Sequence, residues 1–355
     1  MSAPVPEPPP FAVLDDAVIE ARRALPPDAL AYVEGGAEDE RTLEENRHAF
    51  TRWLLRPRLL TGTPAADPST TFLGMPVAMP VLVAPFAGDT LLHAEGYRGV
   101  LEAAATLRTL AVVPEVTGET LEALASAAPD AARVFQLSLR HPHAVLVDLL
   151  SRAADAGYSA LCVTVDVPVV GVRRRELRNP GARLEIANFP SRATGFIDDT
   201  GERERPWTWA RLADVMAASE LPFAVKGVLT AEDARAAVHA GAAAVYVSNH
   251  GGRQLDSAPA TLDQLAEIVD EVGGDAEVAL DGGVRSGGDV VKALALGARA
   301  VLVGRPACYG LAAGGRAGVH RVLEILRHEL VTAMTLLGRA RVADLDRTVL
   351  QPARR

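Results

Sequence analysis

Short apolar segments recur along the chain from residue 81 onward, and longer segments with helical spacing separate them. Short apolar runs bounded by turn residues are typical of strands buried on both faces, as in a parallel sheet. We predict strands at residues 81–84, 110–113, 133–137, 160–165, 223–226, 244–247, 277–280 and 300–303. Apolar positions three and four residues apart predict helices at residues 94–107, 142–156, 231–240, 262–272 and 288–296.

This alternation of strands and helices predicts an α/β fold, the (β/α)8 TIM barrel. Local signals agree with the predicted boundaries. Thr230 precedes an acidic first turn, as at the start of a helix, while Gly241 and Gly297 lie where glycines commonly end one. A doubly wound open sheet is the alternative fold, but no G-x-G-x-x-G sequence follows the first predicted strand.

The remaining segments add to this barrel. Helical spacing at residues 15–24 and 42–50 predicts an N-terminal helical extension, and residues 171–206 predict a long polar loop after strand four, which we expect to be a lid. Residues 316–337 have the pattern of a long amphipathic helix with a structural role. The proline-rich residues 1–10 predict a disordered tail, so residues 11–355 form the single predicted domain.

Composition excludes several classes of protein. A formal net charge of -9 over 355 residues argues against a nucleic-acid partner, which would favour a basic face. No apolar run is long enough to span a bilayer, and the N-terminus lacks the pattern of a signal peptide, so we expect a cytoplasmic protein with no membrane partner. The two cysteines, Cys162 and Cys308, predict neither a disulfide framework nor a metal cluster.

Polar residues lie at or just beyond the carboxyl ends of the predicted strands. In a TIM barrel these positions come together at one mouth, where the loops build the active site. One such end carries His250 and, three residues later, Arg253. An imidazole can act as a base and a guanidinium can bind a carboxylate in a bidentate manner, so the pair suits oxidation of a carbon beside a carboxylate. A surface turn with solvated charges is the alternative interpretation.

The last two loops of the predicted barrel indicate an anion site. The sequence DGGVRSGG at residues 281–288 precedes a helix, and Gly304 and Arg305 follow the last strand. Glycine-rich backbone, a helix N-terminus and two guanidiniums together favour a phosphate. Because the chain has no P-loop sequence ending in Lys-Ser or Lys-Thr, we expect a phosphate-bearing cofactor instead of a nucleoside triphosphate.

These motifs give the chain a family resemblance, from about Tyr32 to about Leu337. It resembles the FMN-dependent 2-hydroxy acid oxidase and dehydrogenase family, the group of glycolate oxidase, lactate oxidase and mandelate dehydrogenase. The resemblance implies an FMN-binding barrel, commonly assembled as a homotetramer. The sequences that carry it are GGAEDERTLEENRHAF, LLRPRLL, TVDVPVVGVRRREL, VKGVLTAEDA, VSNHGGRQLD and DGGVRSGGDVVKALALGARAVLVGRP.

The resemblance also implies which residues hold FMN. Lys226 would lie beside the flavin and stabilise negative charge on the reduced ring. Residues whose backbone would face the ring are Ala84, Pro85 and Ala87. Residues that would hydrogen-bond to the ring are Gln136, Thr164 and Ser248. Residues that would hold the ribityl phosphate are Asp281, Gly283, Arg285, Gly304 and Arg305.

The implied reaction converts a 2-hydroxy acid to a 2-oxo acid, with dioxygen or another acceptor taking the electrons. His250 would be the base and Asp166 would orient its ring. Arg173 and Arg253 would clamp the substrate carboxylate, and Tyr32 would hydrogen-bond to it. Hydride transfer and a carbanion route are both compatible with these residues.

Three positions depart from the family pattern. The substrate-facing residue after strand three is Ser138, where the family usually has a tyrosine, and Phe86 replaces a common threonine. Glu115 either faces the pocket, where it would suit a bulkier or cationic substrate, or is an exposed loop acid. We therefore expect a substrate bulkier than glycolate or lactate. The alternatives are an amine or peptide-derived substrate in secondary metabolism, and a flavin-binding protein without turnover.

Overall fold

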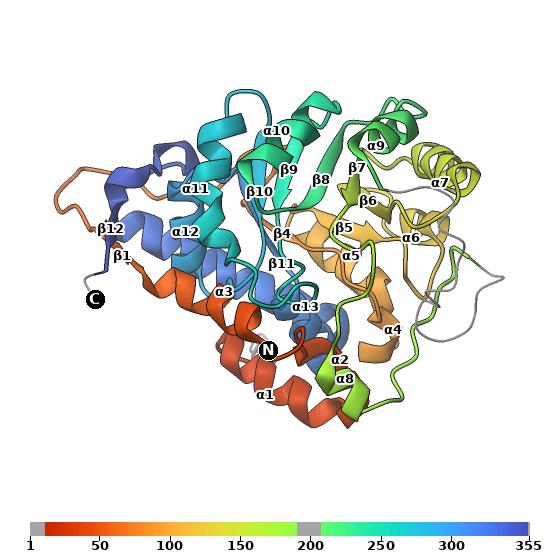
Figure 1. Ribbon diagram of the computed structural model, residues 1–355. Helices are drawn as coiled ribbons and strands as arrows, with labels where there is room; N and C mark the ends of the chain where they lie inside the picture. Colours follow the sequence, from red (N-terminus) through yellow and green to blue (C-terminus); the bar gives the residue numbers. More distant parts are fainter. Residues whose placement is uncertain (1–10, 190–206, 354–355) are drawn as a thin grey trace, which may run out of the picture.

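The computed structural model of the chain describes residues 11–189 and 207–353, and its centre is a closed barrel of eight parallel strands (Figure 1). The ring order is β10-β11-β4-β5-β6-β7-β8-β9. The predicted TIM barrel is thus confirmed and the open sheet is excluded. The strands are β4 (Val81–Val83), β5 (Ala111–Pro114), β6 (Arg133–Ser138), β7 (Ala160–Thr164), β8 (Phe223–Val228), β9 (Ala244–Val247), β10 (Glu277–Leu280) and β11 (Ala300–Val303).

Helices surround the barrel, as the alternating pattern predicts. The helices that follow the strands are α5 (Gly96–Thr106), α6 (Leu121–Ala127), α7 (His143–Asp155), α9 (Trp209–Met216), α10 (Ala231–His239), α11 (Thr261–Val272), α12 (Gly287–Ala295) and α13 (Arg305–Leu336). The Thr230 hydroxyl caps α10 by accepting the backbone N–H of Asp233 at 3.2 Å. Gly241 and Gly297 have φ of +94° and +110°, a conformation that glycine adopts without a steric penalty at a helix end.

Helix α13 differs from its prediction, since it begins at Arg305 and not near residue 316. The backbone at Gly314 and Gly315 is not helical, so a kink divides α13 into two helical halves. A Cβ on Gly318 would lie 1.9 Å from the carbonyl oxygen of Gly310, so the glycines permit close approach across the kink. Helix α13 packs against α1 (Leu14–Ala24), α5 and α12.

The predicted N-terminal extension consists of α1, α2 (Pro27–Glu34) and α3 (Arg41–Thr51), which lie along one side of the barrel (Figure 1). Strand β1 (Trp53–Leu55) pairs antiparallel with β12 (Leu350–Pro352), so the segment after α3 meets the C-terminal end of the described chain. Strands β2 (Thr70–Phe72) and β3 (Met75–Val77) form a hairpin. The remaining short elements are α4 (Asp89–Leu92), α8 (Arg174–Arg178), η2 (Val342–Asp344) and η3 (Arg347–Val349).

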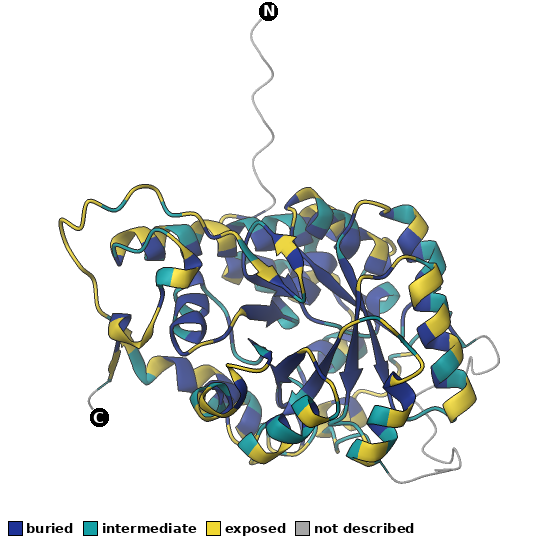
Figure 2. Cartoon of the chain, turned by 90° about the horizontal axis from the view of Figure 1, so that it is seen from above, coloured by how far each residue is buried: buried dark blue, intermediate teal, exposed yellow. Residues whose placement is uncertain are grey.

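Two apolar layers stabilise the barrel. Strand side chains that point into the barrel, such as Leu82, Tyr246 and Leu302, form one core together with Phe72 and Met75 of the hairpin. Side chains on the outer faces of the strands form the other core with the helices. Figure 2 shows these buried strands enclosed by helices whose outer faces are exposed. Burial of an aliphatic side chain stabilises a protein by roughly 1.5–3 kcal/mol, so these layers make the barrel a rigid support for its loops.

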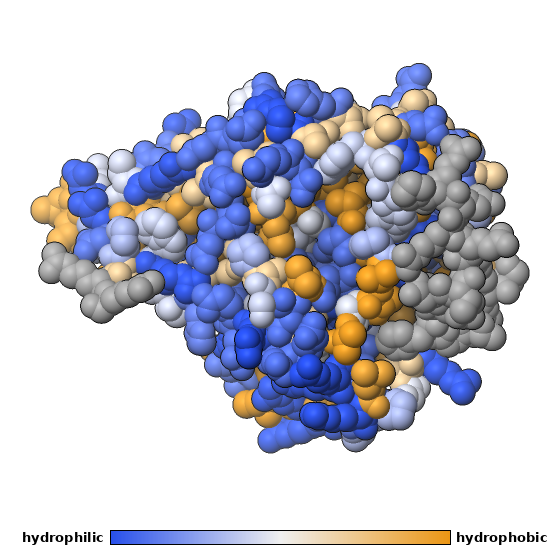
Figure 3. Space-filling model, viewed as in Figure 1, coloured by the Kyte–Doolittle hydropathy of each residue, from blue (hydrophilic) through white to orange (hydrophobic). Residues whose placement is uncertain are grey.

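The surface seen in the view of Figure 1 is largely hydrophilic, with a group of apolar side chains near its centre and beside α8 (Figure 3). Within the described residues, no helix combines the length and apolar character needed to cross a membrane. The predicted tail at residues 1–10 and the charged run at residues 198–205 of the predicted lid lie outside the described residues.

Candidate active site

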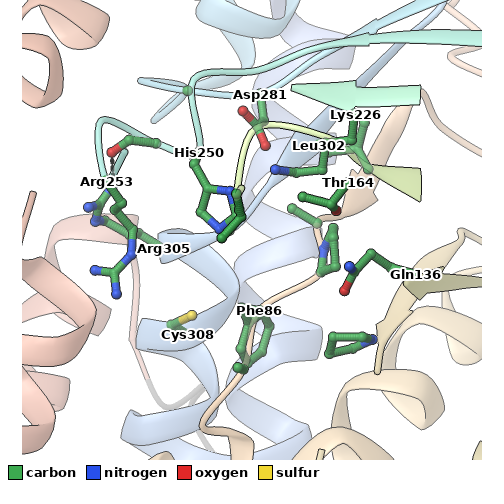
Figure 4. A pocket seen from close by; sticks show the side chains of 18 of the residues that line it. Phe86, Gln136, Thr164, Lys226, His250, Arg253, Asp281, Leu302, Arg305 and Cys308 are labelled. Atoms are coloured by element: carbon green, nitrogen blue, oxygen red, sulfur yellow. Dashed lines mark hydrogen bonds between the residues drawn. The ribbon is translucent and has the colours of Figure 1, made fainter. Parts of the chain in front are cut away.

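The carboxyl ends of the barrel strands surround one pocket, shown in Figure 4. Asp166 and Ser248 do not line this pocket but contact His250 instead. The Ser248 hydroxyl accepts the backbone N–H of His250 at 3.1 Å, and its hydrogen bond to the flavin stays a prediction. The predicted residues that line the pocket are Tyr32, Ala84, Pro85, Ala87, Gln136, Ser138, Thr164, Arg173, Lys226, His250, Arg253, Asp281, Gly283, Arg285, Gly304 and Arg305.

His250 follows β9 and points into the pocket between Arg253 on one side and Thr164 and Lys226 on the other (Figure 4). Its φ of +58° is in the left-handed region, where a residue other than glycine is strained by about 1–3 kcal/mol. The Nδ1 atom of His250 lies 3.1 and 3.2 Å from the two carboxylate oxygens of Asp166. Since Asp166 occupies Nδ1, Nε2 is the ring nitrogen that remains for a substrate.

Electrostatics keep this histidine available as a base. Burial lowers the pKa of His250 most strongly and Lys226 lowers it further, whereas Asp166 opposes both effects. Burial alone would raise the pKa of Asp166, but His250 and Lys226 outweigh it and leave that pKa lowered. At neutral pH the site therefore contains a neutral imidazole oriented by an ionised carboxylate.

Lys226 lies at the end of β8 between two carboxylates and is almost completely buried. Burial opposes its charge, but Asp166 and Asp281 outweigh burial and raise the pKa of the ammonium. The Tyr246 hydroxyl donates to Oδ2 of Asp281 at 2.8 Å. Among the described residues, Oδ1 of Asp281 is buried without a hydrogen-bond partner. A buried carboxylate oxygen at a pocket wall suits a ligand that donates a hydrogen bond.

Arg173 and Arg253 are brought together in the pocket by a buried carboxylate that the sequence did not reveal. Oε1 of Glu176 lies 3.0 Å from a terminal nitrogen of Arg253 and 3.4 Å from one of Arg173. The Arg253 guanidinium also stacks over the Tyr32 ring at 4.9 Å. Burial and the nearby Arg253 lower the pKa of Arg173 to about 10. Glu176 follows Arg173 by three residues, a helical spacing that could have indicated the pair.

Arg253 and Arg305 also bind backbone carbonyls. Arg253 donates to the carbonyl of Gly35 at 2.8 Å, and Arg305 donates to the same carbonyl at 2.9 Å. Arg305 further donates to the carbonyls of Val33 and Gly251 at 2.9 and 2.8 Å. These bonds join the end of α2 to the loop that carries His250. The extension is therefore part of the site.

The residues around the predicted phosphate position fit an anionic cofactor. Burial and the neighbouring guanidiniums of Arg253 and Arg285 lower the pKa of Arg305 to about 9, and a phosphate would offset this repulsion. A Cβ built on Gly304 would meet no protein atom nearer than 3.9 Å, so this pocket wall leaves room for a ligand. With the unpartnered oxygen of Asp281, this donor set fits the phosphate and ribityl hydroxyls of FMN.

The pocket wall near the ends of β4, β5 and β6 contains the three departures from the family pattern, because Phe86 follows β4, Glu115 follows β5 and Ser138 ends β6. Glu115 is buried and lines the pocket, so the interpretation as an exposed loop acid is wrong. Its Oε1 accepts the Ser138 hydroxyl at 2.6 Å, and its Oε2 lies 3.2 Å from Nε2 of His141. The Phe86 ring packs against Tyr97 at 5.2 Å between centroids. His141 was not predicted as a site residue.

Helix α3 supports the His250 loop through further polar contacts that were not predicted. The side-chain amides of Asn46 and Asn249 are buried and paired. The Asp256 carboxylate accepts the backbone N–H groups of Asp39 and Thr42 at 3.1 and 2.9 Å, so a distant loop caps this helix. These residues lie inside conspicuous motifs, but each contact joins residues that are more than 200 positions apart in the sequence.

Comparisons with known proteins agree with this geometry. The family model described as FMN-dependent dehydrogenase matches residues 21–352. A peroxisomal (S)-2-hydroxy-acid oxidase of Oryza sativa subsp. japonica is 43% identical over 339 residues, which cover 92% of each chain. An L-lactate oxidase of Nostoc sp. is 42% identical and covers 93% of this chain and 95% of its own. A mandelate oxidase structure with benzoyl-formic acid has a TM-score of 0.89 at 40% identity, covering 97% and 98% of the two chains.

Proposed function

Since the chain belongs to the FMN-dependent dehydrogenase family, we propose that it oxidises a 2-hydroxy acid larger than glycolate or lactate. Its cofactor is FMN, and its reaction is oxidation of a 2-hydroxy acid at the CH–OH group. We further propose dioxygen as the electron acceptor, because the hydroxy-acid, lactate and mandelate relatives are oxidases.

The arrangement of His250 and Asp166 is the observation that carries the proposed chemistry. Oxidation removes two protons and two electrons from the substrate CH–OH group, and FMN, when bound, would supply the acceptor for both electrons and for one of the protons. Nε2 of His250 accepts a proton from the substrate, because Nδ1 is held by Asp166. Asp166 then stabilises the imidazolium that forms. Lys226 places a positive charge in the same buried region and stabilises negative charge that develops there.

The two arginines provide the carboxylate site. Arg173 and Arg253 line the pocket together with Tyr32, and Glu176 balances one of their two charges. The remaining net positive charge matches one substrate carboxylate. Glu176 also holds the two guanidiniums side by side, so that they are oriented for a carboxylate before the substrate binds.

The substrate wall supports the larger size. Ser138 leaves space at the end of β6, where a tyrosine would project into the pocket. Apolar side chains of Val116, Val167 and Leu184 line the same pocket and suit an apolar or aromatic group. The mandelate oxidase relative, whose structure contains benzoyl-formic acid, is consistent with a ligand of this size.

Anaerobic reduction of the FMN-loaded protein by a panel of 2-hydroxy acids tests this function. Glycolate, lactate and mandelate differ in side-chain size, so their rate constants for flavin bleaching can be compared directly. We expect mandelate to reduce the protein faster than glycolate, and air to reoxidise it within the mixing experiment. A clear preference for glycolate would contradict the proposed size. The Ser138→Tyr variant is the matched control, since restoring the phenol should reduce the advantage of mandelate.

A further inference from the structure

A buried polar cluster on the substrate wall is not used by the proposed chemistry. It consists of Glu115, Ser138 and His141 and is called the Glu115 cluster below. The side chain of Glu115 is 7% exposed and that of His141 is 14% exposed. Burial of a carboxylate at a pocket wall costs free energy unless the carboxylate is hydrogen-bonded. The hydrogen bonds that Glu115 already makes therefore determine which acceptor positions remain for a ligand.

The Glu115 carboxylate retains hydrogen-bonding capacity beyond its contacts with Ser138 and His141. Each carboxylate oxygen can accept two hydrogen bonds, and Ser138 and His141 account for one on each oxygen. The carboxylate therefore presents acceptor positions, and no donor of its own, to a ligand in the pocket.

The cluster is held rigidly. The Asn188 side chain donates to the backbone carbonyl of Glu115 at 2.9 Å and accepts the N–H of Leu121 at 2.9 Å. The His141 ring stacks on Phe189 at 4.4 Å between centroids. Because these contacts fix both loops, the carboxylate cannot easily turn away from the pocket.

The order of the strands places this cluster opposite the catalytic histidine. In the closed ring, β5 is four positions from β9, and β6 is four positions from β10. The loop after β5 carries Glu115, whereas the loop after β9 carries His250 and Arg253. A substrate whose carboxylate is held by Arg253 thus extends its side chain across the mouth, toward Glu115.

We propose that Glu115 recognises a hydrogen-bond donor, a hydroxyl or an amine, at the far end of the substrate side chain. This inference rests on the proposed function, because it assumes that a 2-hydroxy acid occupies the pocket. A site built around a buried acceptor rejects a ligand that leaves this acceptor unpaired. Arg140 lines the same pocket and would favour a second carboxylate instead, so the two preferences can be told apart.

The test uses the full-length, FMN-loaded protein and mandelates that differ only at the para position. The substituents are hydroxyl, aminomethyl, methyl and carboxylate, and the measurement is anaerobic flavin reduction against concentration. We expect a hydroxyl or aminomethyl group to be preferred over methyl by about 10- to 100-fold in the second-order rate constant. Comparison of these two donors shows whether the ligand group is neutral or cationic. Equal rates with methyl, or a preference for carboxylate, would overturn the inference.

Binding provides a second measurement that does not require turnover. Phenylacetates with the same para substituents lack the 2-hydroxyl group, and calorimetric titration gives their affinities. The donor preference should appear in these affinities as well. In Glu115→Gln it should fall to within about threefold, because the amide retains the size but loses the charge. In Ser138→Ala it should persist, since the carboxylate remains.

The outcomes separate this inference from the proposed function. If no 2-hydroxy acid reduces the flavin, the proposed function fails. If mandelates reduce it without regard to the para group, only the role of Glu115 fails. FMN content and thermal unfolding of each variant show whether it is folded, and the comparison of ligands on the unmodified protein decides the question even if a variant does not fold.

Discussion

The side-chain amides of Asn46 and Asn249 donate to one another at 2.9 and 2.8 Å, across the boundary between α3 and the loop that carries His250. Asn249 directly precedes His250, and its Oδ1 also accepts the N–H of Gly252 at 3.0 Å. The helical extension therefore positions the proposed base, although it lies outside the barrel itself.

Replacement of Asn46 by alanine should lower both stability and activity. It removes the two amide hydrogen bonds between the buried side chains of Asn46 and Asn249, which costs about 1–3 kcal/mol in the free energy of unfolding. It should also slow flavin reduction, because the His250 loop loses its support. Denaturant unfolding and stopped-flow reduction measure the two effects. Glu44→Ala, on the exposed face of the same helix, is the control and should change neither. If the Asn46→Ala variant reduced its flavin at the wild-type rate, α3 would not position the base.

His250→Gln should retain FMN but lose most flavin reduction. The amide preserves much of the side-chain volume but cannot accept a proton, and loss of a general base slows a reaction by about 10²–10⁴-fold. The visible spectrum reports the bound FMN, and anaerobic mixing with substrate reports the reduction rate. A variant that reduces at the wild-type rate would remove His250 from the role of base.

Activity should depend on pH through His250. Because its pKa is lowered, the imidazole stays neutral to below its ordinary value of 6.5, so kcat/KM should fall only as pH drops further. Asp166 raises the pKa of His250, and Asp166→Asn should therefore move the acid limb to lower pH. The same change should reduce the maximal rate by about 10²-fold or more, since the imidazolium loses its stabilising carboxylate. A limb that moves upward in Asp166→Asn would contradict the assigned pair.

Arg253→Lys should raise the substrate KM by about tenfold or more. An ammonium is a point charge and cannot reproduce the planar fork that binds a carboxylate through two hydrogen bonds. Steady-state kinetics with a preferred 2-hydroxy acid measure the change. Arg174→Lys is the matched control, because Arg174 is 43% exposed and pairs with Asp39. If both variants have the same KM as the parent, Arg253 does not contact the substrate.

The barrel could be predicted from sequence because its strands are buried on both faces. Residues 244–247, 277–280 and 300–303 are continuous apolar runs, and the bounds of β9, β10 and β11 agree with the prediction. The end of a strand is harder to predict where a polar residue continues the strand. The prediction ends at Lys226, whereas β8 extends to Val228. A local pattern thus predicts buried strands well and their polar ends less well.

The contents of the pocket were predictable for a related reason. Carboxyl ends of parallel strands meet, so a residue at the end of a strand is placed by the fold itself. Glu176, His141 and Asn46 were missed, because their roles arise mainly from contacts with loops distant in the sequence. Such contacts depend on loop conformation, which hydrophobic spacing does not encode.

The placement of β5 and β6 opposite β9 and β10 has a consequence for engineering. The Glu115 cluster, which we propose selects the far end of the substrate, belongs to one short stretch, residues 115–141, whereas the proton acceptor and its supporting charges lie beyond residue 164. The preference for a hydrogen-bond donor can therefore be altered at Glu115 and His141 alone, with the reactive half of the ring left intact.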